Sequence, residues 1–237
     1  MRSKGNTIRV SGLAVALAAA VTIGASAVTA RATLIDVNFE ANNSNTMTGA
    51  AILGSSGDTW NNLAGTAPGS TDLLQINNST SGISLATSDH GDYNFTGGNP
   101  GNLMDGYLDG ISGANVILTL NGLPTHATFE LVMYGSVGST SQADSITTSL
   151  TGSTVYTTTG STSNIYAANA NGRAYAVITG NTGSSTTLKI TAAPNTGDSY
   201  SIVNGFQLET AVPEPASLAL YGSGGLVLLL AGRRRRT

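Results

Sequence analysis

Short runs in which apolar and polar residues alternate recur between residues 33 and 209, and turns containing glycine or asparagine separate them. The first run reads Ile35, Asp36, Val37, Asn38 and Phe39. Alternation with a period of two predicts a strand whose apolar face enters the core while its polar face meets solvent. The runs expected to form strands are 33–39, 72–76, 82–86, 114–120, 127–134, 144–150, 153–158, 173–179, 185–191 and 200–209. Short strands in this number indicate an all-β chain folded as a single β-sandwich, with a jelly roll as the expected topology.

Residues 33–211 are expected to form this sandwich as one domain. The chain contains no cysteine, so the core alone must hold the domain together, even where disulfides are available. A domain of roughly 180 residues is large enough to bury a self-sufficient core. Within it, residues 40–112 are richer in glycine, asparagine and aspartate, which predicts long loops between short strands.

The charges of the chain are unevenly distributed. Between residues 33 and 211 there are only two basic residues, Arg173 and Lys189, against twelve acidic ones, a formal charge of −10. A body this acidic repels phosphate backbones. The sequence therefore predicts that the protein does not bind nucleic acid.

The N-terminus has the organisation of a secretory signal peptide. Three basic residues precede the uncharged, mostly apolar run 10–23, and the small-residue pattern Ala25-Ser26-Ala27 follows it. These are the charged, apolar and cleavage-site regions that a signal peptidase reads, so residues 1–32 are expected to form a signal peptide with a helical apolar part. The alternative is a retained N-terminal membrane anchor, for which the apolar run is short.

The C-terminus combines a proline motif, an uncharged segment and a basic end. Val212, Pro213, Glu214 and Pro215 are followed by residues 216–232, which carry no charge, and then by Arg233, Arg234, Arg235 and Arg236. Seventeen residues are at the lower limit for a helix that crosses a bilayer. The arginines would keep that end in the cytoplasm and leave the body on the outer side. The sequence thus predicts a short transmembrane helix over 216–232.

Residues 212–237 resemble the PEP-CTERM sorting tail in motif, order of segments and position in the chain. The resemblance implies a Gram-negative bacterium and recognition by an exosortase, with processing near Pro213, Glu214 and Pro215. The protein would be held transiently in the inner membrane and then reach the cell surface or an extracellular matrix of polysaccharide and biofilm. The alternative is an ordinary single-span anchor that carries the same tripeptide.

Two segments of the body resemble parts of galactose-binding-like jelly rolls. Residues 201–209 are similar to the last strand of that fold, and residues 114–134 are similar to a central pair of strands. The resemblance implies that the last strand returns to lie beside the first. The resemblance concerns the fold alone and implies no particular ligand.

No combination of residues in the sequence predicts a catalytic site. Of the two histidines, His90 and His126, neither lies in a pattern typical of a serine–histidine–aspartate triad. Glycoside hydrolysis needs two carboxylates that face each other across a sugar, whereas Glu130 and Glu209 are expected to be surface charges on strands. We therefore expect a protein that is not an enzyme and needs no cofactor.

Two groups of residues are candidates for binding. Trp60 lies between Asp58 and Asn61, and an aromatic ring beside a carboxylate and an amide is suited to contact a sugar. The alternative is that Trp60 fills the core. Oxygen-bearing side chains in glycine-rich loops are candidate calcium ligands, the alternative being a solvated loop. These residues are Asp89, Asp92, Asn94, Asp105 and Asp109.

Taken together, the sequence predicts an exported, non-catalytic module, structural or in contact with extracellular polysaccharide. The alternative is a secreted polysaccharide hydrolase that uses pairs of aspartates in the loops of residues 89–109 as acid and base.

Overall fold

The computed structural model describes residues 32–41, 46–64, 70–88, 91–94, 103, 106–110, 113–135, 144–152, 154–158, 175–195 and 199–212. The regular structure of these residues is almost entirely β, which confirms the predicted class. None of the helices within the described ranges is long and apolar enough to span a membrane. The expected signal peptide (except Ala32), transmembrane helix and arginine cluster, together with Pro213, Glu214 and Pro215, lie outside the described residues.

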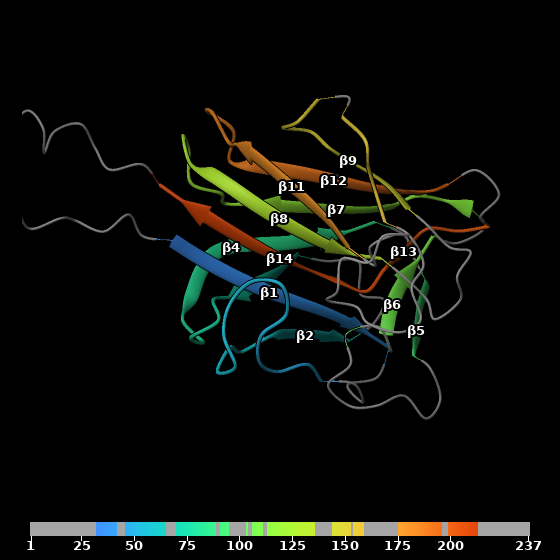
Figure 1. Ribbon diagram of the computed structural model, residues 1–237, viewed down its shortest axis with the longest axis horizontal. Coiled ribbons are helices and arrows are strands. Elements are labelled where there is room, and N and C mark those ends of the chain that lie inside the picture. The colour runs from blue at the N-terminus through green and yellow to red at the C-terminus, as the bar shows by residue number, and fades with distance from the viewer. Residues whose placement is uncertain are drawn as a thin grey trace, which may run out of the picture. The chain divides into compact units, whose positions relative to one another are not determined.

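The strands form two larger sheets and one small sheet (Figure 1). The five-stranded sheet has the order β11 (Tyr175–Asn181), β8 (Thr128–Tyr134), β14 (Gly205–Ala211), β1 (Ala32–Glu40) and β2 (Asn61–Ala64). The six-stranded sheet has the order β10 (Tyr156–Thr157), β9 (Asp144–Thr148), β12 (Thr187–Pro194), β7 (Val116–Asn121), β4 (Thr80–Thr87) and β3 (Ser70–Leu74). The small sheet contains β13 (Ile202–Val203), β6 (Gly106–Asp109) and β5 (Gly91–Asn94).

Alternate side chains of the two larger sheets meet in one apolar core. The five-stranded sheet contributes Ile35, Val37, Phe39, Phe129, Leu131, Met133, Ile178, Phe206 and Leu208. The six-stranded sheet contributes Leu73, Ile83, Leu85, Val116, Leu118, Leu120, Ile146, Leu188 and Ile190. On β12, Leu188 and Ile190 are buried while Lys189 between them is exposed, as the alternation predicts. The face-to-face packing confirms a sandwich.

The first and last strands of the sandwich are neighbours. Strand β1 pairs antiparallel with β14, in a register that runs from Ala32 opposite Ala211 to Asn38 opposite Gly205. This pairing confirms the expected return of the last strand beside the first. On its other edge β1 pairs in parallel with β2.

The strand predictions are wrong in two places. Strands β2, β5 and β6 fall in the region 40–112, each is four residues long, and none was predicted because so short a strand carries no clear alternation. The strand expected over 200–209 is interrupted at Asn204. The backbone of Asn204 bonds instead across the sheet, its N–H to the Tyr134 carbonyl and its own carbonyl to the Phe39 N–H, both at 2.9 Å.

Strand β1 corrects a more consequential prediction. Its polar residues Asp36 and Asn38 were expected to face solvent, but both side chains are buried, as are Glu40 at the end of the strand and the apolar residues that alternate with them. The outer face of the five-stranded sheet is covered at this point by the loop of residues 46–60, which we call the strap. The strap thus forms a third layer on the outer face of the sandwich. The candidate site lies on this face of the five-stranded sheet.

Candidate functional site

The strap is a closed loop whose two limbs bond to each other. Thr48 and Thr59 form an isolated antiparallel bridge, and the Gly49 N–H donates to the Asp58 carbonyl at 3.0 Å. The indole N–H of Trp60 donates to the Gly49 carbonyl at 2.7 Å. Gly49 has a φ of 84°, a left-handed conformation that glycine adopts without the steric cost of a side chain. The base of the strap is thus held by its own bonds.

Two side chains of the sheet bond to the tip of the strap: Gln207 of β14, and Tyr134 of β8, whose hydroxyl accepts from the Ile52 N–H at 3.2 Å. The Gln207 Oε1 atom accepts hydrogen bonds from the Ile52 N–H (3.0 Å), the Leu53 N–H (2.9 Å) and the Tyr134 hydroxyl (2.6 Å). Its Nε2 group donates to the Leu53 carbonyl and to Asp36 Oδ1, both at 3.0 Å. This amide therefore satisfies three part-buried backbone groups of the strap, of which, among the described residues, only the Ile52 N–H has a second partner, the Tyr134 hydroxyl.

Between strap and sheet lies a second cluster of apolar and aromatic side chains. It contains Met47 and Trp60 from the strap and Val132, Tyr134 and Tyr175 from β8 and β11. The rings of Tyr134 and Tyr175 are tilted by 52° with centroids 6.0 Å apart, a favourable aromatic arrangement. We call Val132, Tyr134 and Tyr175 the tyrosine layer.

The residues expected to contact a sugar come together, but they are used internally. Trp60 is only 4% exposed, so its ring faces are covered and present no platform for a sugar to stack on. The carboxylate of Asp58 accepts from the Ser55 N–H and hydroxyl at 2.6 and 2.8 Å. The Asn61 amide donates to the carbonyls of Asp36 and Leu74 at 2.9 and 2.8 Å. This burial supports the alternative reading of Trp60 as a core residue and corrects the expectation of an exposed platform.

Among the described residues beneath the strap, Asp36 has a strongly raised pKa. Burial raises the pKa of Asp36 from 3.8 to about 7, an effect that the Gln207 hydrogen bond opposes and the nearby Asp58 carboxylate reinforces. Its Oδ1 atom accepts from Gln207, whereas Oδ2 is buried and has no hydrogen-bond partner. Sequence reasoning missed this group because it expected the polar face of β1 to be solvated.

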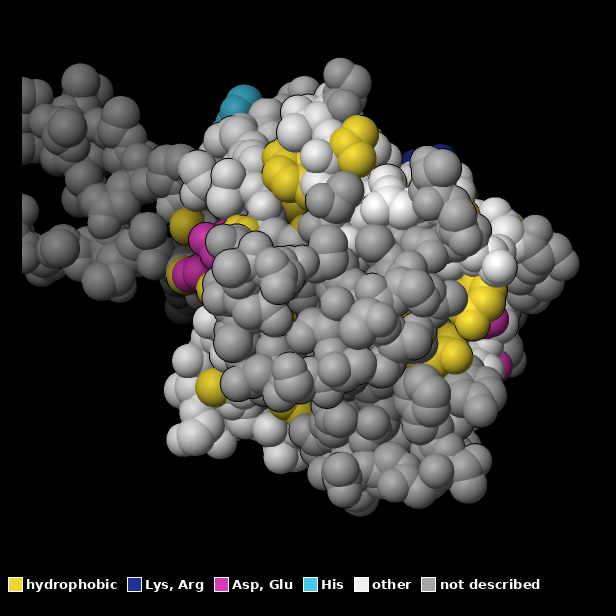
Figure 2. All heavy atoms as spheres, turned by 45° about the vertical axis from the view of Figure 1, so that its right-hand side comes forward, with side chains coloured by type: hydrophobic (Ala, Val, Ile, Leu, Met, Phe, Trp, Pro, Cys, Tyr) yellow, Lys and Arg dark blue, Asp and Glu magenta, His cyan; other side chains and the backbone are white. Residues whose placement is uncertain are grey.

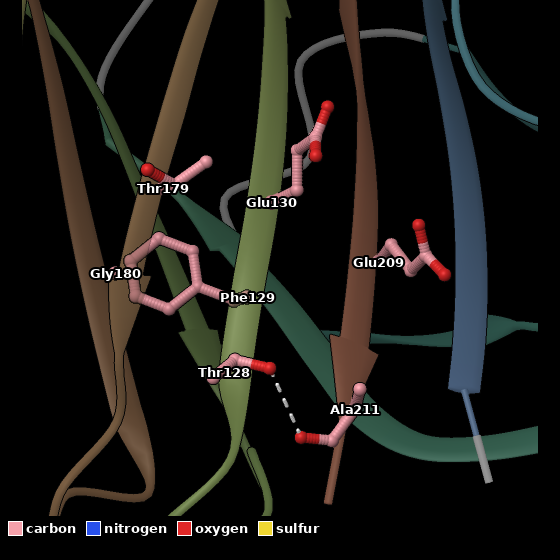
Figure 3. Close-up of a pocket in the computed structure, with 7 residues that line it drawn as sticks. All are labelled: Thr128, Phe129, Glu130, Thr179, Gly180, Glu209 and Ala211. Carbon is pink, nitrogen blue, oxygen red and sulfur yellow. Dashed lines mark hydrogen bonds between the residues drawn. The ribbon is translucent and has the colours of Figure 1, made fainter. Parts of the chain in front are cut away.

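Beside the strap the outer face of the five-stranded sheet is hollowed into an open groove of about 520 Å³. Its lining comes from β8, β11 and β14, and Figure 3 shows these residues: Thr128, Phe129, Glu130, Thr179, Gly180, Glu209 and Ala211. Glu209 lies directly opposite Glu130 in the strand register, and Thr179 lies opposite Glu130 on the other side. The groove is therefore lined by two carboxylates from neighbouring strands, with a threonine beside them.

The two carboxylates do not converge on one point. In Figure 3 Glu209 leans toward β1, while Glu130 extends along its own strand. The Thr128 hydroxyl at the groove's end donates to the Ala211 carbonyl at 3.3 Å. Like charges directly opposite each other destabilise a sheet, so the pair brings no advantage to the fold. The sequence analysis treated both glutamates as isolated surface charges because nothing local indicates that their strands are neighbours.

The candidate calcium ligands are only partly within the described residues. Asp92 and Asn94 lie on β5, opposite Leu108 and Gly106 of β6. Asp109 lies on β6, opposite Gly91 of β5. Asp89 and Asp105 lie outside the described residues. A Cβ atom at Gly91 would overlap the Asp109 carboxylate, so the glycine allows this close approach. Within the described ranges no group of three or more histidine, cysteine, aspartate or glutamate side chains is arranged to hold a metal ion.

The surface of the body carries few charges. Figure 2 shows a face on which, among the coloured atoms, acidic side chains lie at the edges and lysine or arginine atoms barely emerge. The remaining coloured surface is mostly uncharged polar side chains and backbone, with scattered apolar groups. Such a surface offers hydroxyl and amide groups to a partner rather than a strong electric field.

Comparison with known proteins gives remote structural likenesses only, to four chains among the solved structures. No protein-family model and no curated protein matches the chain. One similar structure is the plant peptide RALF23 in complex with FER and LLG2 (TM-score 0.38, 18% identity, covering 76% of this chain and 40% of that one). Another is the C-terminal CBM6 of LamC, a marine laminarinase from Zobellia galactanivorans (TM-score 0.29, 10% identity, covering 52% of this chain and 89% of that one). At these TM-scores neither likeness bears on the function, which has to be argued from the geometry.

Proposed function

We propose that this protein is an exported, non-catalytic module that contacts carbohydrate through the groove of Glu130 and Glu209. The observation that carries the proposal is the register of β8 and β14, which brings the two glutamates together in the lining of an open groove. A carboxylate accepts hydrogen bonds from sugar hydroxyls, and a threonine hydroxyl both donates and accepts. Carboxylates and hydroxyls in a shallow groove suit a polymer that passes across the surface.

The proposed ligand is an uncharged polysaccharide. Both the groove and the body around it are acidic, and a negative surface disfavours an anionic polymer. The groove is open rather than enclosed, so it does not have the shape expected for a small molecule that is bound from all sides. A neutral chain that offers rows of hydroxyl groups fits both features.

Export and sorting complete the proposal. Residues 1–32 would direct the chain through the membrane, and the PEP-CTERM-like tail would hand it to an exosortase for release to the cell surface or matrix. Strand β14 ends at Ala211, and Val212, the first residue of the motif, is 40% exposed. An exposed start, followed by two prolines that cannot continue a strand, supports access by a processing enzyme. We also propose the jelly roll as the topology of the sandwich, supported by the pairing of β1 with β14.

The test is binding to an array of neutral and charged glycans by the wild type, Glu130→Gln, Glu209→Gln and the double variant. We expect the wild type to bind neutral polymers and the double variant to bind them at least about tenfold more weakly, because hydrogen bonds to charged groups contribute about 1.5–3 kcal/mol each. Asp72→Asn, an exposed carboxylate on β3 of the other sheet, is the matched control and should bind normally. Wild-type binding that the double variant retains in full would exclude the groove.

The same samples distinguish binding from hydrolysis. A non-catalytic module should release no reducing ends from the glycans it binds. Release that Asp92→Asn or Asp109→Asn abolishes would instead favour the alternative, a hydrolase that uses aspartates of the 89–109 region.

A further inference from the structure

We propose that the strap is a pH-sensitive cover, closed while Asp36 is protonated and released when Asp36 ionises, and that its release extends the groove onto the tyrosine layer. The extension of a binding surface rests on the function proposed above. The movement of the strap does not, because it follows from the bonds and charges under the strap alone.

The cover and the groove share one sheet face. The strand register places Glu209, Glu130 and Thr179 in one row across β14, β8 and β11. The next row contains Asp36, Gln207, Val132 and Val177, and the row after it contains Asn38, Gly205, Tyr134 and Tyr175. The groove occupies the first row, and the next two rows are covered by the strap together with Leu103, which lies against Gly205. Removing the strap would therefore continue the groove along the sheet.

The attachment of the strap tip is concentrated on one side chain. Three of its backbone groups, the N–H groups of Ile52 and Leu53 and the carbonyl of Leu53, bond to the amide of Gln207. The same amide donates to Asp36 Oδ1. Any change that repositions Gln207 or Asp36 thus acts on all three strap bonds together.

A negative charge on Asp36 is unfavourable only while the strap is closed. The Asp36 side chain is fully buried, its Oδ2 atom has no hydrogen-bond partner, and the nearby Asp58 of the strap is a second carboxylate. The strap, β2 and β14 bring no lysine, arginine or histidine to it. The other titratable groups of its surroundings are Tyr134, which bonds to Gln207, and two carboxylates: Glu40, four residues from Asp36 along β1, and Glu209, two residues from Gln207 along β14. Opening lets water solvate the charge, so ionisation favours the open strap.

The surface beneath the strap has the chemistry of a carbohydrate site. It combines the rings of Tyr134 and Tyr175 with the Gln207 amide, and aromatic rings beside amides meet both the apolar faces and the hydroxyls of a sugar. The groove outside the strap has carboxylates and hydroxyls but no tyrosine among its lining residues. Opening would add the stacking surface that the exposed groove lacks.

Trp60, the only tryptophan of the chain, reports on this movement without any added ligand. Its ring is buried under the closed strap and bonded to Gly49 within it. We expect acrylamide quenching of Trp60 fluorescence in the full chain to increase from pH 5 to about 7 and then to level off, because the opening constant rises by up to about tenfold per pH unit only while Asp36 ionises in the open form and stays protonated in the closed form. Asp36→Asn should show low quenching at every pH, and the control Asp72→Asn should follow the wild type.

Quenching of the wild type that stays constant from pH 5 to 8.5, or that rises equally in Asp36→Asn, would overturn the proposal. If far-ultraviolet circular dichroism shows that Asp36→Asn does not fold, the same quenching measurement is made on Asp58→Asn instead. Loss of the Asp58 charge should lower the pKa of Asp36 in the closed form, so the quenching should level off at a lower pH and at a lower value than in the wild type, and an unchanged curve contradicts the proposal. The quenching experiment contains no glycan, so it tests only the movement of the strap. Carbohydrate binding is tested separately by the glycan array, and either proposal can fail without the other.

Discussion

Gln207 is a buried amide that joins three parts of the molecule: β14, the strap and the polar face of β1. Replacing it with alanine would remove the bonds of the Leu53 N–H, the Leu53 carbonyl and the Asp36 carboxyl, and would leave the Ile52 N–H with the Tyr134 hydroxyl as its acceptor. Unsatisfied buried polar groups cost about 1–3 kcal/mol each, so we expect Gln207→Ala to lower the free energy of unfolding by about 3 kcal/mol. For a domain of this size the melting temperature should fall by about 6–12 °C.

A matched control for Gln207 is Gln75, whose amide donates to the Thr80 carbonyl at an exposed position. Gln75→Ala should change the melting temperature by less than about 2 °C, since exposed hydrogen bonds are replaced by bonds to water. Equal effects of the two substitutions would show that Gln207 does not hold the strap.

The burial of Asp36 should give the folded chain a pH dependence of stability opposite to that caused by an ordinary surface carboxylate. Burial raises its pKa in the folded chain from 3.8 to about 7. The folded state therefore keeps a proton that the unfolded state has already lost, and stability falls as the pH rises from about 4 to about 7 and is then constant. The total effect is at most about 4 kcal/mol.

Melting temperatures of the wild type and Asp36→Asn at pH 5, 6, 7 and 8 test this dependence. The wild type should lose stability relative to the variant as the pH rises, and the difference should level off above pH 7. A difference that is the same at all four pH values would mean that Asp36 is ionised in the folded chain throughout.

At the scale of elements, the approach of β14 to β1 depends on Gly205. A Cβ atom at this position would overlap the carbonyl oxygen of Val37, which is backbone and cannot rotate away. Gly205→Ala should therefore separate the two strands locally and destabilise the fold by about 2–4 kcal/mol, as overpacked or strained sites do. The measurement is urea unfolding followed by circular dichroism.

The control for Gly205 is Gly57 in the strap, where a Cβ atom would meet no atom within 4 Å. Gly57→Ala should leave the urea midpoint nearly unchanged. A neutral result for Gly205→Ala as well would show that β1 and β14 can separate at Gly205 without loss.

At the scale of the whole molecule, the core lies entirely within one of the compact units of the chain, Arg31–Pro213. Among the described residues, all of the buried apolar side chains that fill the sandwich come from this unit, and all except Leu123 come from its strands. A chain shortened to residues 31–213 should therefore fold by itself, with a β-type circular dichroism spectrum and one cooperative melting transition. A helical spectrum, or the absence of a transition, would contradict the assignment of the core.

Much of the fold could be predicted because strand signals are local. Leu188, Lys189 and Ile190 lie on the faces that their alternation predicts, and Gly122 has the positive φ expected of the turn after Asn121. The return of the last strand beside the first was also predicted, through a family resemblance, and β1 and β14 confirm it. The four-residue strands β2, β5 and β6 were missed, since their residues carry no period of their own.

The candidate site could not be predicted in the same way. Glu130 and Glu209 are far apart in sequence, and only the pairing of β8 with β14 makes them neighbours. Trp60 stands between two polar residues in the sequence, which suggested exposure, but the strap folds its ring against Val132 and the tyrosines. Neighbouring residues in the chain carry no information about what a loop will cover.

The sequence by itself determined the class of the fold and the acidic charge of the body, because backbone alternation and formal charge are properties of short stretches and of composition. It also carries the expectation of export, which resides in the order of residues at the two ends. Only the tertiary structure decided that Asp36 is buried, that one amide holds the strap, and that two glutamates share a groove. Burial and juxtaposition depend on which distant strands pair and on which loops pack over them. Strand pairing is in turn determined by the cooperative packing of the whole core.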